Sequence, residues 1–214
     1  MPAPGSPTKV YSIPTVATWT NIDLDDQETL PCPRAFHCMC RVQDFLFVLG
    51  GEGGHYGPDC DILSDVWRFD MQRMIWTEVS TSGEPPRVSR AACALLNGTT
   101  IIICGGFDGM FNTSDVYGLN LRTNVWTKYQ IMGDVPAGGF CHHTANVLPE
   151  GRILIVLTRS GCRNCEFFEL LIHHDAPKAI YRRIAGIELK TELLEQKLKV
   201  GSVIGALWVL CRPN

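Results

Sequence analysis

The sequence predicts an all-β fold built from repeated units of four short strands. Apolar runs end in paired glycines, and aromatic residues recur in the same order about 50 residues apart. Trp76 and Trp126, for example, are separated by 50 positions. Four features that keep one order at one period indicate a structural repeat. The repeated positions are Gly50, Gly51, Trp67 and Trp76 in one unit, and Gly105, Gly106, Tyr117 and Trp126 in the next.

Each unit contains four segments with strand character. The run FLFVLGG is continuously apolar, as expected of a strand buried on both faces. The segment DVWRFD alternates with period two, which is typical of a half-buried strand. A last segment carries a Trp and is followed by a Gly/Pro turn, TSGEPP in one unit and IMGDVP in the next. Because no long helical period interrupts these segments, we expect antiparallel four-stranded units.

Stacked units of this kind predict an incomplete β-propeller. A four-stranded unit buries its faces only against neighbours, so repetition favours blades arranged around an axis. We expect three blades, at 30–79, 85–129 and 136–184, and a lone terminal strand at 17–24. In the third blade Thr158-Arg159 takes the place of the double glycine, which predicts a distorted blade or a shifted register.

The paired glycines and the spaced aromatic residues resemble kelch repeats. The resemblance covers 17–184 and is strongest over 30–130. It implies a propeller fold, and it implies a protein-binding role such as substrate recognition for a ubiquitin ligase or a cytoskeletal or regulatory adaptor. The repeated glycine and aromatic residues are interpreted as structural, and both repeated tryptophans are expected to pack between blades.

The two ends of the chain depart from the repeat. Residues 1–16 are predicted to be disordered, and 185–214 to form a weak helix followed by a strand of a partial blade. At about 50 residues per blade, 214 residues give little more than four blades. Three explanations stay open: a fragment, a half-propeller completed by another chain, and a short open arc. A shortened form of a longer propeller protein is favoured.

Composition excludes several classes of partner. The formal net charge is −3 and the pI is about 6.1, so a nucleic-acid surface is not expected. The longest apolar run near the end, VGSVIGALWVLC, is far shorter than the roughly 20 residues of a membrane span. The start of the chain lacks the pattern of a signal peptide, so we expect thiol cysteines in a cytoplasmic or nuclear protein.

Three motifs are candidate chemical sites. Cys162 and Cys165 form a C-x-x-C, but a structural zinc site normally has a second well-spaced pair of ligands. Cys141 beside His142 and His143 suggests a nucleophile and base, yet His142 matches His37 of the first unit, which favours packing. GEGGHYG lacks the helix and lysine of a phosphate loop. The prediction is therefore a protein without catalytic residues, metal or cofactor, and a propeller enzyme or metal-binding protein is the alternative.

Two loops are the candidate partner-binding site. The 52–64 and 107–114 loops leave equivalent strands and should emerge on the same rim of the propeller. They carry aromatic residues and Met, which anchor many interfaces, and carboxylates that favour a partner with basic flanks around an apolar segment. The alternative is that these apolar residues fold back and cap the blades. The residues are Tyr56, Asp59, Asp61, Phe107, Asp108, Met110 and Phe111.

Overall fold

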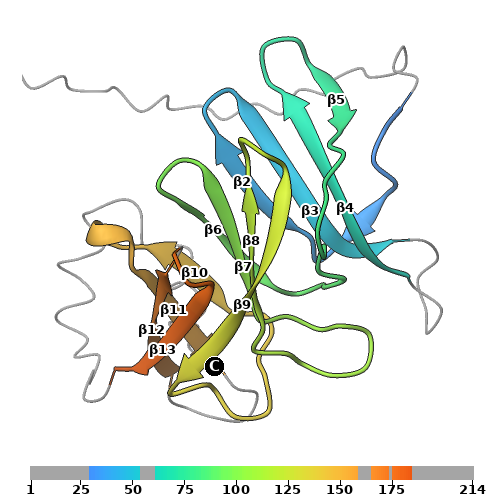
Figure 1. The fold of residues 1–214 in the computed structure, drawn as a ribbon. Coiled ribbons are helices and arrows are strands. Elements are labelled where there is room, and N and C mark those ends of the chain that lie inside the picture. Colours follow the sequence, from blue (N-terminus) through green and yellow to red (C-terminus); the bar gives the residue numbers. More distant parts are fainter. Residues whose placement is uncertain (1–28, 54–60, 159–164, 174, 185–214) are drawn as a thin grey trace, which may run out of the picture.

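A computed structural model of the chain contains an all-β fold (Figure 1). The residues that it describes are 29–53, 61–158, 165–173 and 175–184. Within them the single helical element is one 3-10 turn, Pro149–Gly151. The predicted all-β class is therefore confirmed. The segments expected at 1–16, 17–24 and 185–214 lie outside the described residues.

The first blade is a separate antiparallel sheet. Its strands follow one another in space as they do along the chain, except that β1 adds to the end of β3. They are β1 (Arg34–Ala35), β2 (Cys38–Val42), β3 (Phe45–Gly53), β4 (Asp61–Asp70) and β5 (Ile75–Glu78).

The second and third blades each contain four antiparallel strands in chain order. The second consists of β6 (Ala92–Leu96), β7 (Thr100–Cys104), β8 (Val116–Asn120) and β9 (Val125–Gly133). The third consists of β10 (Thr144–Val147), β11 (Ile153–Thr158), β12 (Cys165–His173) and β13 (Lys178–Arg183).

Two positions differ from the sequence-based expectation. The loop expected at 52–64 is shorter than predicted, because β3 continues to Gly53 and β4 begins at Asp61. A bulge between Leu49 and Gly51 lets the pairing resume beyond the double glycine. In the third blade, Thr144 pairs with Val156 as Cys38 pairs with Leu49, so Leu157-Thr158 replaces the glycines, one residue earlier than predicted.

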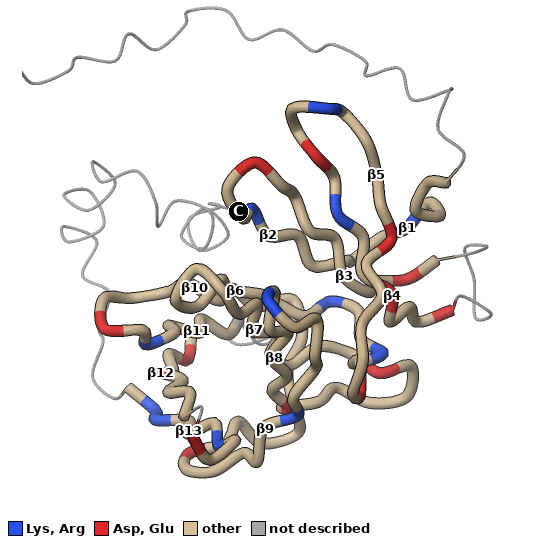
Figure 2. The backbone as a smooth tube through the Cα atoms, turned by 45° about the horizontal axis from the view of Figure 1, so that its top comes forward, with Lys and Arg blue, Asp and Glu red and all other residues tan. Residues whose placement is uncertain are grey.

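The second and third blades are joined at their outer edges, which the repeat pattern did not predict. The outermost strand β13 pairs in parallel with the end of β9, from Lys178 opposite Gln130 to Tyr181 opposite Gly133. The innermost strands β6 and β10 also contact each other. Figure 2 shows the result, a curled eight-stranded sheet whose strands run around a ring. These two blades therefore form one sheet rather than two separate ones.

Two apolar cores hold the blades together. One fills the curled sheet and includes Ile102, Val116, Ile153, Leu170 and Tyr181. The other lies between the first and second blades and includes Phe47, Leu49, Ile101, Leu119 and Trp126. In both, alternate residues of facing strands meet, as expected when two sheets pack face to face.

The double glycines allow successive blades to approach closely. Gly51 and Gly106 have φ values of +97° and +105° and donate their N–H groups to the next blade, to Val88 O at 3.1 Å and Phe140 O at 2.7 Å. A Cβ on the preceding glycine would enter the next blade, since it would lie 2.7 Å from Val88 O at Gly50 and 2.8 Å from Phe140 O at Gly105. A Cβ on Gly51 or Gly106 would instead meet its own blade, 2.6 Å from Ala35 O and 2.7 Å from Ser89 O. None of the four sites has room for a side chain, because backbone atoms occupy the space.

Gly106→Ala is expected to destabilise the protein much more than Gly98→Ala. Both glycines have positive φ, but a Cβ at Gly98 would meet nothing within 4 Å. Gly98→Ala should cost about 1–2 kcal/mol for the left-handed backbone alone. Gly106→Ala should cost about 3 kcal/mol or more because overpacking adds to that cost. Equal unfolding free energies of the two variants in urea would contradict this account of the double glycine.

The two repeated tryptophans lie in different surroundings. Trp126 is 4% exposed, because its face of the second blade packs against the first blade. Trp76 is only half-buried: it packs on Phe69, with ring centroids 4.9 Å apart, on the face of the first blade that points away from the second. The expected burial between blades therefore applies to Trp126 and not to Trp76.

Trp126→Ala should lower the free energy of unfolding by about 3–5 kcal/mol, as expected for loss of a fully buried large side chain. Trp76→Ala should cost about 1–2 kcal/mol, since less apolar area is buried there. Chemical denaturation of both variants tests the difference. A larger effect at Trp76 would contradict the arrangement of the blades.

Candidate functional site

The connections at one end of the strands form a continuous surface, here called the loop face. It comprises 29–37, 79–91, 105–115 and 134–143, and the ribbon in Figure 1 places the 105–115 loop at the same end of the strands as β1. Backbone hydrogen bonds link its segments: Ser89 and Phe107 exchange two of them, and Phe140 N donates to Thr113 O. Three blades therefore contribute to one connected surface.

Three equivalent residues on this face have left-handed backbone conformation although none is glycine. Phe36, Arg90 and His142 have φ values of 55°, 56° and 54° and each stands two residues before the innermost strand of its blade. Arg90 N donates to Phe36 O, and His142 N donates to Arg90 O, both at 2.9 Å. Such strained positions are uncommon outside glycine and are enriched at functional sites.

The side chains of this row form a cluster, here called the arginine–aromatic cluster: Phe36, Glu52, Arg90, Phe107 and His142. The Arg90 guanidinium lies over the Phe36 ring at 4.9 Å and over the Phe107 ring at 5.2 Å. Its Nε is 2.9 Å from a Glu52 carboxylate oxygen, which also accepts a bond from Ser89 Oγ. The His142 ring meets Phe36 edge to face at 5.7 Å. Cation–π contacts and an ion pair thus fix Arg90 in place.

Beside this cluster, the 107–114 loop displays two exposed apolar side chains. Met110 is 78% exposed and Phe111 is 71% exposed. The loop is held from within by Asp108, whose Oδ1 accepts from the N–H groups of Met110 at 2.8 Å and Phe111 at 2.7 Å. These backbone bonds hold the pKa of Asp108 below its usual value. The apolar residues are therefore presented by an ordered turn.

The candidate binding residues from the sequence fall into three groups. Tyr56 and Asp59 lie outside the described residues, whereas Asp61 is exposed at the start of β4. Phe107 is half-buried under Arg90, and the next residues of its loop are exposed. The 107–114 loop and the start of β4 are neighbours, because a Cβ on Gly109 would lie 3.4 Å from Ile62 Cγ1.

Sequence reasoning missed the arginine–aromatic cluster. It compared His37 with His142, whereas the backbone makes Phe36 the residue equivalent to His142. Three unlike side chains, Phe, Arg and His, give no repeat signal. The irregular motifs that precede the innermost strands, PRAFH, PRVSR and GGFCHH, were the available indication.

Asp65, within β4, and Asp115, immediately before β8, occupy equivalent positions in the repeat and have structural partners. Arg34 binds both carboxylate oxygens of Asp65, at 2.6 and 2.7 Å, and Trp67 Nε1 donates to the same carboxylate at 2.7 Å. Burial alone would raise the pKa of Asp65, but the bonds from Arg34 and Trp67 outweigh it and lower that pKa.

In the second blade, Lys128 and Tyr117 contact Asp115 in the corresponding way, at 2.8 and 3.2 Å. These networks connect strands within one blade.

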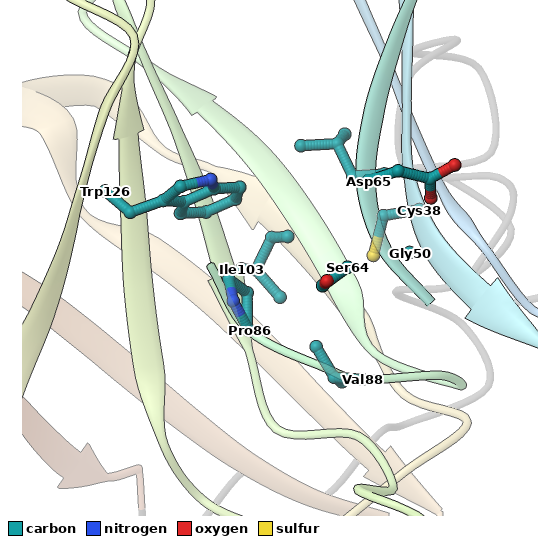
Figure 3. A pocket seen from close by; sticks show the side chains of 9 residues that line it. Cys38, Gly50, Ser64, Asp65, Pro86, Val88, Ile103 and Trp126 are labelled. Atoms are coloured by element: carbon teal, nitrogen blue, oxygen red, sulfur yellow. The ribbon is translucent and has the colours of Figure 1, made fainter. Parts of the chain in front are cut away.

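A pocket between the first and second blades is too small for a substrate. Figure 3 shows its lining, with Ser64 and Asp65 on one side and Trp126 on the other. Its volume of about 10 Å³ is room for one water molecule. Trp126 Nε1 is buried there, and none of the described residues accepts a hydrogen bond from it, so a single water is the ligand that this space fits.

The cysteine and histidine motifs do not assemble into a reactive site in the described part of the chain. His143 Nε2 lies 3.7 Å from Cys104 Sγ rather than beside Cys141, and its ring packs edge to face on Phe140 at 4.5 Å. Cys165 is half-buried, and Cys162 lies outside the described residues. Among the residues that the structure describes, no three His, Cys, Asp or Glu side chains are placed to hold a metal ion.

The repeated antiparallel blades and the loop face define the class of the protein, an incomplete β-propeller built from sequence repeats. The chain matches the model of the KLHDC2/KLHL20/DRC7 Kelch-repeats domain over residues 7–156. It therefore belongs to the kelch-repeat family, which confirms the resemblance found in the sequence.

Three curated relatives illustrate the range of proteins to which part of this chain is similar. Kelch domain-containing protein 9 of Homo sapiens is 30% identical over 131 residues, 60% of this chain and 36% of the relative. The Rab9 effector protein with kelch motifs of Xenopus laevis is 30% identical over 105 residues, 49% of this chain and 28% of the relative.

The third relative, tRNA wybutosine-synthesizing protein 2/3/4 of Arabidopsis thaliana, is 32% identical over 108 residues, 50% of this chain and 10% of the relative. The matches thus span little more than a third of these relatives at most. In the part of the chain that the structure describes, no helix has the length and apolar character to cross a membrane.

His143 should make the protein less stable in mild acid. It is 8% exposed, and burial, followed by its neighbour His142, lowers its pKa to about 4, although a hydrogen bond with Cys104 opposes the shift. The unfolded chain binds this proton near pH 6.5, so stability is full above that pH and falls as the pH drops toward 4.

The loss due to His143 between pH 7 and pH 4.5 should be about 2–2.5 kcal/mol. Urea denaturation at pH 7 and at pH 4.5 measures it, and His143→Gln should show a correspondingly smaller loss. The same loss in His143→Gln as in the parent would show that another group causes the acid sensitivity.

Proposed function

We propose that the chain is a protein-interaction module that binds its partner on the loop face. The observation that carries the proposal is the 107–114 loop, in which Asp108 orders a turn that leaves Met110 and Phe111 exposed. An ordered loop loses less conformational entropy on binding than a free one, and exposed Met and Phe are frequent interface anchors. Membership of the kelch-repeat family supports the same function.

The chemistry around these anchors favours a partner with an apolar segment and basic flanks. Asp108 and Asp61 are exposed beside the loop tip, and Figure 2 shows acidic residues where β3 ends and β4 begins. The net charge of −3 adds a weak attraction for a basic partner. The basic Arg90 is already paired with Glu52, so it does not oppose this preference.

The proposed cellular role is that of an adaptor. Substrate recognition for a ubiquitin ligase and a cytoskeletal or regulatory adaptor role are both compatible with a binding face on kelch repeats. The relative named as a Rab9 effector supports an adaptor role. We place the protein in the cytoplasm or nucleus and infer that it is not an enzyme. Pairing with another chain to complete the propeller belongs to the same proposal.

An enzyme is the second candidate, because one relative is named as a tRNA wybutosine-synthesizing protein. The match covers 10% of that relative, so the similarity concerns a small part of that protein. Stoichiometric metal in the purified full chain would favour this candidate over the adaptor.

The double variant Met110→Ser, Phe111→Ser should keep the melting temperature of the parent and lose its partner. Side chains that are 78% and 71% exposed contribute little to folding, whereas anchors at an interface contribute much to affinity. A photo-crosslinking amino acid at position 111 should give discrete adducts in cell extract, and the same group at position 75 should not.

Ile75 is the matched control, since it is also an exposed apolar residue but lies on β5 of the first blade. A lowered melting temperature of the double variant would show that the loop caps the blades instead. Equal crosslinking at positions 75 and 111 would rule out the loop face.

A further inference from the structure

Three thiols meet where the innermost strands of the first two blades contact each other. Cys38 and Cys40 lie on the same face of β2, and Cys93 lies on the facing side of β6. The Cys93 thiol donates to the carbonyl of Met39, the residue between the other two, at 3.4 Å. It therefore lies between Cys38 and Cys40, although more than 50 residues separate it from them along the chain.

The thiols of this group differ in access. Cys38 is buried, whereas Cys40 and Cys93 are half-buried, and all three are free. Strands β2 and β6 contact each other, and Cys93 lies near enough to Cys40 and to Cys38 to be coupled to both in pKa. When a half-buried thiol is oxidised to a sulfenic acid, a neighbouring thiol can react with the sulfenic acid and form a disulfide.

We propose that Cys40 and Cys93 form an oxidation site, at which peroxide converts the two thiols into a disulfide that links the first blade to the second. This link would join β2 to β6, the strands that follow Phe36 and Arg90 in the chain. It would thus fix the relative position of two blades whose contact is otherwise noncovalent.

The reaction balances with one hydrogen peroxide as the oxidant. The Cys40 sulfur attacks a peroxide oxygen, the O–O bond breaks, and the sulfur becomes a sulfenic acid with release of one water. The Cys93 sulfur then displaces the hydroxyl group, which leaves as a second water with the Cys93 proton. Two thiols and one peroxide give one disulfide and two waters, so the thiols lose two electrons and the peroxide gains them.

The surroundings predict a slow reaction. The hydrogen bond with Cys93, followed by burial, raises the pKa of the Cys40 thiol well above its usual value. The hydrogen bond with Cys38 and burial likewise raise the pKa of Cys93. Because the thiolate is the reactive form, oxidation should be slow at neutral pH and faster at higher pH. The two thiols should therefore form the disulfide during prolonged exposure to peroxide and not during a brief one.

Peroxide treatment of the full chain, followed by blocking of free thiols and non-reducing peptide mapping, tests the proposal. One crosslinked peptide pair joining Cys40 to Cys93 is expected, with loss of two hydrogen atoms. The link closes a loop of about 50 residues, so the melting temperature should rise on the order of 5–10 °C and return after reduction.

Variants distinguish this site from general thiol oxidation. Cys93→Ser and Cys40→Ser should each abolish the crosslink and the shift in melting temperature. The control is Cys32→Ser, which removes an exposed thiol two residues before β1 and should keep both the crosslink and the shift. Because Cys40→Ser and Cys93→Ser could also perturb packing, the melting temperature of each variant in its reduced form is compared with that of the reduced parent. A disulfide to Cys38, a sulfinic acid at Cys40 without a crosslink, or no reaction would overturn the proposal.

Discussion

Close approach of the backbones of successive blades, which glycine permits at positions 50 and 105, is the constraint on which the remaining structure depends. The glycine that follows each of them, Gly51 or Gly106, has positive φ and donates its N–H to the blade that comes next. The bond sets the distance between blades, so Trp126 and Leu119 can meet the first blade across an apolar core. The same approach brings Arg90 between Phe36 and Phe107. Core and candidate site thus share one origin.

The third blade lacks this double glycine and joins its neighbour in a different way. Leu157-Thr158 stands where the first two blades have glycines, and the outermost strand β13 pairs with β9 instead of standing apart. Gly133, with φ of +83°, leaves the room that the Tyr181 carbonyl occupies at this junction. Backbone groups at the outer edges of both strands are thereby hydrogen-bonded. The second and third blades consequently act as one curled sheet to which the first blade is attached.

Periodicity was sufficient to predict the strands and the blades, because glycine pairs and buried aromatic residues have repeated physical roles. It could not predict the parallel pairing of β13 with β9, which depends on the path of the chain after Val125 rather than on any repeated residue. The arginine–aromatic cluster could not be predicted for a different reason. Phe36, Arg90 and His142 share a left-handed backbone conformation, but their side chains differ, so the sequence contains no repeated residue that would indicate the shared φ.

The exposure of the 107–114 loop was likewise beyond sequence reasoning, which left binding and capping open. The side chain of Asp108 orders the turn through its bonds from Met110 N and Phe111 N, and both apolar side chains are exposed there. An Asp two or three residues before apolar residues is a recognisable turn signal. Whether that loop binds a partner stays a prediction.

Hydrogen exchange at single amides tests the central claim most directly. The N–H groups of Gly51, Gly106, Arg90 and His142 lie at strand ends and in connections, where amides ordinarily exchange fast, yet each is bonded to a neighbouring blade. The account predicts that these four amides exchange as slowly as those of the central strand β7 and lose protection together with it. Fast exchange at Gly51 and Gly106, with β7 still protected, would contradict it.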